Sequence, residues 1–150
     1  MIKSCPKTRA HKRSKTPNVM ALKRKLDKRL SAMVRTRDAE LPCISCGEYN
    51  ILQAGHFVKR KPLTTRWHPM NVNGECAGCN AFDESHLIGY IKGIERKYGQ
   101  GVAEELVKLS KVRWKVLPDQ LQRLIAATND PDQYVQVWDE VEKEFSGGSQ

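Results

Sequence analysis

The sequence of 150 residues has no apolar run that approaches the roughly 20 residues needed to span a bilayer. Its basic N-terminus also has no apolar signal segment, so we expect a cytoplasmic protein that does not enter a membrane. Disulfides are rare in such a compartment. No internal repeat is visible, and the length corresponds to one domain with tails.

Acidic residues are almost absent from the first 37 positions, where Asp27 stands alone among 13 lysines and arginines. The chain as a whole carries a net charge of +9 and has a pI near 9.5, whereas residues 130–144 are rich in acid. This asymmetry predicts a nucleic-acid partner for the N-terminal end and a solvated or subunit-packing surface at the other end. Residues 1–15 have almost no large apolar side chains and many cations, so we expect a disordered basic tail there.

Four of the five cysteines form two Cys-x-x-Cys pairs, and Cys5 in the basic tail is expected to be an idle thiol. Two such turns supply the four thiolates of a closed tetrahedral zinc site, which holds a fold together and leaves no open position for catalysis. Disulfides are the competing interpretation, and the expected compartment argues against them. The predicted structural zinc ligands are Cys43, Cys46, Cys76 and Cys79.

A helix is predicted to begin at Thr16-Pro17, with threonine as the N-cap and proline at the first helical position. Apolar residues then recur at steps of three and four from Val19 to Met33, and cations occupy the other faces. A later loop between the cysteine pairs is also strongly basic. The candidate DNA-binding residues in these two segments are Lys23, Lys25, Lys28, Arg29, Lys59, Arg60, Lys61 and Arg66.

The segment between the cysteine pairs predicts a β-hairpin. Residues 51–54 form a short strand that leads to Gly55-His56-Phe57, and a second strand around Val72 returns to Cys76. Asn80 follows the second pair directly, where asparagine is a favoured helix N-cap.

This arrangement suits hydrolysis of a phosphodiester, which needs a base for the attacking water and positive charge on the phosphate oxygens. Histidine is largely neutral at cellular pH and can accept that proton, so His56 is the candidate base. Mg²⁺ or Mn²⁺ would supply the charge, and an asparagine carbonyl is a suitable hard ligand, which makes Asn80 the metal candidate. Asn71 would hold the hairpin and orient His56. A histidine beside glycine in a zinc finger is also often merely packed or hydrogen bonded.

The order of these residues resembles the HNH, or ββα-metal, nucleases in their His-Asn-Asn variant. In that pattern a histidine is followed by an asparagine five residues before a Cys-x-x-Cys and by another asparagine directly after it. The wider string is similar to the lambdoid-phage NinG/Rap recombination endonucleases. The resemblance covers about residues 22–98 and is carried by RTRDAELPCISCG, AGHFVKRKPLTTRW, NVNGECAGCN and YIKGIERKYG.

The resemblance implies an α+β fold in which a zinc-stapled ββα finger is flanked by helices. It also implies a divalent-metal-dependent endonuclease that cuts Holliday junctions and D-loops in phage recombination, with His56, Asn71 and Asn80 as catalytic residues. A four-way junction has symmetry-related strands, so we expect a homodimer. Many HNH sites carry a metal-binding aspartate just before the histidine, whereas this chain has Gly55 there. Asp83, Glu84 and His86 are the acidic and histidine residues placed to complete the ligand set.

The remaining sequence predicts mostly helices. Residues 16–110 are expected to form the nuclease core, 111–145 a C-terminal helical extension and 146–150 a flexible tail. A stripe of Leu87, Ile91, Ile94 and Tyr98 predicts one helix, whereas residues 112–116 alternate in the strand period.

Two other functions are open on the sequence alone. The first is a non-catalytic zinc module that binds DNA or RNA by charge and shape, which does not require His56 and Asn71 in register. The second is a structural subunit of a larger replication assembly, which a large apolar patch on the last two helices would favour.

Overall fold

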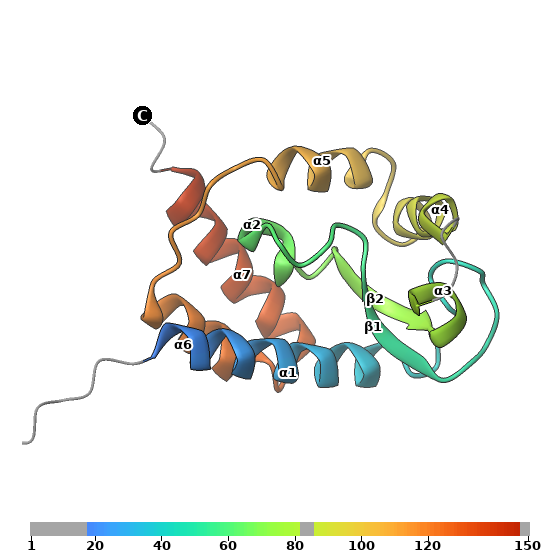
Figure 1. Cartoon of the computed structure of the whole chain (residues 1–150), viewed down its shortest axis with the longest axis horizontal. Helices are drawn as coiled ribbons and strands as arrows, with labels where there is room; N and C mark the ends of the chain where they lie inside the picture. The colour runs from blue at the N-terminus through green and yellow to red at the C-terminus, as the bar shows by residue number, and fades with distance from the viewer. Residues whose placement is uncertain (1–17, 82–85, 148–150) are drawn as a thin grey trace, which may run out of the picture.

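The computed structural model describes residues 18–81 and 86–147. In chain order the elements are α1 (Val19–Arg37), β1 (Leu52–His56), α2 (Leu63–Arg66), β2 (Val72–Cys76), α3 (Ala77–Ala81), α4 (His86–Tyr98), α5 (Val102–Leu109), α6 (Pro118–Ala127) and α7 (Pro131–Ser146). The described part of the chain is therefore mostly helical with one antiparallel hairpin (Figure 1), which confirms the α+β class. Within it, no helix is both long and apolar enough to cross a bilayer.

The long basic helix α1 begins two positions later than predicted. Its N-cap is Asn18, whose side-chain oxygen accepts hydrogen bonds from the backbone N–H groups of Met20 and Ala21 at 3.0 and 3.3 Å. Asparagine satisfies the free N–H groups of a first turn as well as threonine does. The predicted cap, Thr16, and Pro17 lie outside the described residues. The apolar stripe is confirmed, because Leu26, Leu30 and Met33 are buried.

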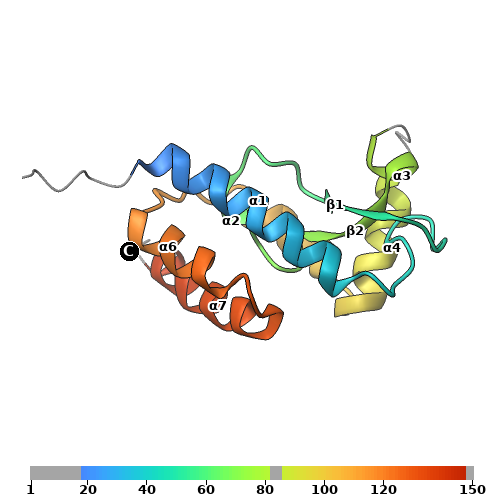
Figure 2. The same cartoon turned by 90° about the horizontal axis from the view of Figure 1, so that it is seen from below.

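The main core joins α1 to the C-terminal helices. Helix α6 packs against α1 and α7 packs against α6, and the hairpin lies toward the C-terminal end of α1 (Figure 2). Trp67 from the hairpin loop, Trp114 and Trp138 meet edge-to-face in this core, with ring centroids 6.1 Å apart for each consecutive pair. The predicted extension 111–145 therefore shares its hydrophobic core with the segment before it.

Residues 112–116 do not form a strand. They run extended between α5 and α6 without a partner in the sheet, and Trp114 and Val116 are buried whereas Arg113 and Lys115 are exposed. The alternation thus marks Trp114 and Val116 as core residues, which a linker can supply as well as a strand, whereas Val112 at its start is exposed.

The predicted stripe of α4 is confirmed in part, because Ile94 is buried and Tyr98 packs against the same cluster. Tyr90, Gly93 and Ile94 are buried, whereas Leu87 is 42% and Ile91 37% exposed. The reason is backbone proximity, because a Cβ on Gly93 would lie 2.0 Å from the carbonyl oxygen of Ile44 in the first cysteine loop. A Cβ on Gly89 would likewise lie 2.2 Å from the carbonyl oxygen of Ser45. The glycine face of α4 therefore rests directly on that loop.

Candidate nuclease site beside a four-cysteine cluster

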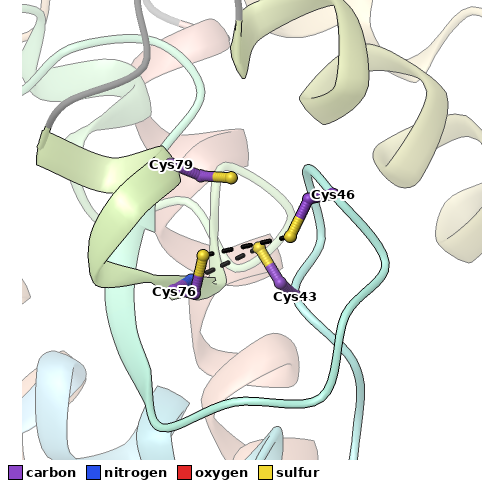
Figure 3. A group of neighbouring side chains, drawn as sticks. All are labelled: Cys43, Cys46, Cys76 and Cys79. Atoms are coloured by element: carbon purple, nitrogen blue, oxygen red, sulfur yellow. Dashed lines mark hydrogen bonds between the residues drawn. The ribbon is translucent and has the colours of Figure 1, made fainter.

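The four predicted zinc ligands come together at the open end of the hairpin. Cys43 and Cys46 lie in the loop before β1, Cys76 ends β2, and Cys79 lies in α3; their sulfur atoms point toward a common centre (Figure 3). All four Sγ atoms lie within 4.8 Å of one another, and those of Cys46 and Cys76 are 3.9 Å apart. A tetrahedron with zinc–sulfur bonds of 2.3 Å has edges of about 3.8 Å. The cluster therefore fits a structural zinc ion.

The backbone around the cluster supports this assignment. Gly47 has a φ of +77°, and its N–H closes the first cysteine turn onto the carbonyl of Cys43 at 2.9 Å. The N–H of Cys76 donates to the sulfur of Cys43 at 3.3 Å, a bond that stabilises a thiolate ligand. The four cysteines are all free of disulfides.

His56 lies at the other end of the hairpin, where it ends β1 opposite Val72. Its Nε2 lies 3.0 Å from the carbonyl oxygen of Arg66. Because a carbonyl only accepts, Nε2 must carry the proton, and the neutral ring then keeps its lone pair on Nδ1. Burial lowers the pKa of His56 to about 4, with the positive charge of Arg60 adding to the effect and the bond to Arg66 opposing it. The imidazole is therefore neutral at cellular pH.

Asp27 on α1 holds the segment that bonds His56. Its carboxylate accepts from Nε and Nη2 of Arg66 at 2.9 and 2.5 Å, and from the indole N–H of Trp67 at 2.8 Å. These bonds fix the backbone whose carbonyl bonds His56. Arg66 was predicted to contact DNA, but in this structure its guanidinium is paired within the protein.

Asn71 lies just before β2, fully buried, and ties the hairpin loop together. Its side-chain oxygen accepts from the N–H of Val58 at 2.8 Å, and its amide nitrogen donates to the carbonyls of Val58 and Thr65, each at 2.9 Å. Val58 lies two residues after His56, and Thr65 directly precedes Arg66. Asn71 thus joins the two loop segments that flank the imidazole.

Asn80 does not cap a helix as predicted. Helix α3 begins earlier, at Ala77, because the helical backbone starts within the second cysteine pair, so Asn80 lies near the end of this helix. Its amide nitrogen donates to the side-chain oxygen of Gln53 at 2.9 Å, and its own side chain is exposed. Gln53 and His56 point to opposite faces of β1. Asn80, which bonds Gln53, therefore lies on the other side of the strand from His56, and the two side chains share no hydrogen bond. Asp83 and Glu84 lie outside the described residues.

Glu75 is a functional candidate that the sequence did not identify. It pairs with Gln53 across the hairpin, and its side chain is 0% exposed. Its Oε1 accepts from the hydroxyl of Ser45 at 2.5 Å and lies 2.8 Å from Nδ1 of His86, at the start of α4. The sequence pattern could not reveal that Glu75 is buried, because its burial depends on α4, which covers this face of the hairpin.

The other candidates remain as surface cations or packed residues. Lys25, Lys28, Arg29, Lys59, Arg60 and Lys61 are exposed and Lys23 is half-buried, and none of them forms an ion pair within the described ranges. His68 is packed in the hairpin loop, with its ring 5.3 Å from that of Trp138. Its Nδ1 accepts from the N–H of Met70 at 3.1 Å, and burial lowers its pKa to about 4.

Comparison with known proteins identifies relatives of this chain. The family described as "Bacteriophage Lambda NinG protein" matches residues 3–135. "Protein ninG" of Escherichia phage 933W is 31% identical over 91 residues, which cover 58% of this chain and 45% of that protein. "Protein ninG" of Escherichia phage lambda is 30% identical with the same coverage. The matched region thus spans less than half the length of these relatives, and no solved structure matches the chain. Since the family match covers most of the sequence, the chain belongs to the bacteriophage lambda NinG family.

Proposed function

We propose that this chain is a divalent-metal-dependent endonuclease with an HNH-like ββα site, which cuts branched DNA such as Holliday junctions and D-loops during phage recombination. The observation that carries the proposal is the hydrogen bond from His56 to Arg66. It gives a neutral imidazole whose Nδ1 lone pair is available, at the end of a strand in a zinc-stapled hairpin. A general base needs this protonation state and a fixed orientation.

In the proposed reaction Nδ1 of His56 takes a proton from the water that attacks the scissile phosphorus. Burial and the charge of Arg60 both disfavour the resulting imidazolium, and a phosphate anion bound next to it would offset both effects. Asn71 and Asp27 keep Arg66 in place, so that the ring does not rotate as it gains the proton. Asn80 is the candidate ligand for Mg²⁺ or Mn²⁺, which when bound would supply positive charge to the phosphate oxygens.

The preference for branched DNA and the homodimer rest on the family resemblance and on the symmetry of a junction. The exposed cations of α1 and of the hairpin loop support a nucleic-acid partner, because such contacts neutralise phosphates without reading sequence. The same cations also favour the second candidate function, a zinc module that binds DNA or RNA by charge and shape without cutting it.

Incubation with a labelled four-way junction, with and without Mg²⁺ or Mn²⁺, separates the two candidates. The nuclease proposal predicts metal-dependent nicking by the wild type and its loss in His56→Ala, while the variant still binds the junction. If the wild type binds the junction but leaves every strand intact in both metals, the zinc-module interpretation holds instead.

A further inference from the structure

Glu75 has one oxygen that the described residues leave without a hydrogen-bond partner. Ser45 and His86 both bond to Oε1, whereas Oε2 is buried and has no partner. A buried carboxylate oxygen is costly unless a donor or a cation meets it. The position is also unusual, because Oε2 lies only 2.3 Å from the point that a Cβ on Gly55 would occupy. The carboxylate therefore fits against β1 only because residue 55 has no side chain.

The surroundings of Glu75 gather further oxygen atoms on the same face of the hairpin. Gln53 lies directly opposite Glu75 and is bonded to the amide nitrogen of Asn80 at 2.9 Å. That bond uses the nitrogen of Asn80, so its carbonyl oxygen is the atom left for a ligand. Gly55, against which Oε2 rests, is adjacent to His56. Carboxylate and amide oxygens are the ligands that Mg²⁺ and Mn²⁺ prefer, and Mg²⁺ needs only one or two of them besides water.

We propose that Oε2 of Glu75, together with the carbonyl oxygen of Asn80, binds the divalent cation of this protein. Ser45 and His86 are positioning residues in this site, since they hold Oε1 and thereby keep Oε2 directed at Gly55. The carboxylate comes from β2, across the hairpin from His56. The cation is then held on the α4 side of β1, and the candidate base lies at the end of the same strand. The assignment of this ion to phosphodiester cleavage rests on the proposed nuclease function, whereas the binding of the ion does not.

Mn²⁺ titration of the zinc-loaded full chain without DNA, followed by the loss of the free Mn²⁺ signal in electron paramagnetic resonance, tests this site. We expect Glu75→Gln, which keeps the shape and the acceptor for Ser45, to weaken binding at least tenfold. Glu48→Gln removes the same charge from an exposed position and should bind as the wild type does. Gly55→Ala should also weaken binding, because its Cβ displaces the carboxylate without removing it.

A second measurement on the wild type does not depend on any variant folding. Low concentrations of Mn²⁺ should broaden the amide signals of Gly55, Glu75 and Asn80 first. Broadening centred on the acidic helix α7, unchanged binding in Glu75→Gln, or no binding by the wild type would each overturn the proposal. If binding depends on Glu75 but the wild type cuts no junction in either metal, the cation site stands and the nuclease function fails.

Discussion

At the scale of single residues, the geometry around His56 depends on groups far away in the sequence. Arg66 bonds the imidazole through its backbone carbonyl and bonds Asp27 through its side chain, so one residue transmits the position of α1 to the candidate base. Asn71 adds a second constraint through Thr65. A base fixed from two sides loses little freedom when substrate binds, which favours a defined direction for proton transfer.

Asp27→Asn tests this constraint. The amide oxygen can still accept from Nε of Arg66 and from Trp67, but the NH2 group that replaces Oδ2 cannot accept from Nη2 of Arg66, and the negative charge is lost. Arg66 and the carbonyl that bonds His56 should therefore become less ordered. We expect single-turnover junction cleavage to fall by about tenfold, less than the roughly 10²–10⁴-fold that a general base itself contributes, because Asp27 acts on His56 only through Arg66. Glu40→Gln, an exposed acid after α1, is the matched control and should cleave as the wild type does. An unchanged rate in Asp27→Asn would show that Asp27 serves only folding.

The sequence made His56 and Asn71 candidates because a histidine followed by an asparagine five residues before the second cysteine pair matches the His-Asn-Asn pattern. Asp27 carried a weaker signal, as the single acid in a basic segment. Glu75 could not be found in this way, because its contact with Gly55 is a diagonal across the hairpin and depends on the register and on α4. The expected N-cap role of Asn80 failed because the helix begins inside the cysteine pair.

At the scale of elements, the four-cysteine cluster joins the first cysteine loop, the end of β2 and the short helix α3. The hairpin has only two strands, and such a sheet is marginal by itself in water. Zinc binding by four thiolates can contribute about 10–16 kcal/mol to folding, which is enough to hold a loop, a strand and a short helix together.

Cys43→Ser should therefore remove one bound zinc per chain and abolish cooperative unfolding of the hairpin region. Zinc content by atomic absorption and thermal unfolding by circular dichroism measure the two effects together. The expected loss in stability is several kcal/mol, because the remaining three thiolates leave the tetrahedron incomplete. A variant that melts like the wild type would show that the thiols are not a structural site.

The packing of α4 on the first cysteine loop predicts that Gly93→Ala lowers the stability of the protein, which is the opposite of the usual effect of this substitution in a helix. Gly→Ala in a helix normally stabilises by about 1 kcal/mol, but in Gly93→Ala the new Cβ would meet the carbonyl of Ile44. We expect a net loss of about 1–3 kcal/mol, seen as a lower midpoint of thermal unfolding. Gly78→Ala in α3 is the control, since its nearest neighbour is 4.0 Å away, and it should not destabilise. Stabilisation by Gly93→Ala would mean that α4 lies further from the loop.

The apolar periodicity predicted α1 correctly, but on α4 it placed Ile94 and Tyr98 correctly and wrongly placed Leu87 and Ile91 on the inner face. Glycines have no hydropathy signal, yet Gly89 and Gly93 decide which side of α4 can approach the loop. In residues 112–116 the alternation was real, but a strand also needs a partner, which a single segment does not reveal.

At the scale of the whole molecule, the exposed charge of α1 and the hairpin loop has the opposite sign to that of α7. The exposed cations of α1 and of the hairpin loop lie on segments that flank His56 along the chain, whereas α7 is acidic. Each phosphate neutralised by such a cation releases counterions, so binding should weaken steeply with salt.

Lys28→Ala tests whether the exposed face of α1 contacts DNA. The slope of the logarithm of the junction-binding constant against the logarithm of salt concentration should become shallower by about 0.9, the value for one lost phosphate contact. Lys143→Ala removes an exposed cation from α7 and should leave the slope unchanged. Equal slopes for Lys28→Ala and the wild type would place the DNA on another surface.

The central claim is that His56 removes the proton from the attacking water. The most direct measurement is the single-turnover cleavage rate of a four-way junction in Mg²⁺, at protein concentrations that saturate the DNA, for the wild type and His56→Ala. We predict a loss of about 100-fold or more in the variant, with its zinc content and junction affinity unchanged. Cleavage by His56→Ala at the rate of the wild type would contradict this account.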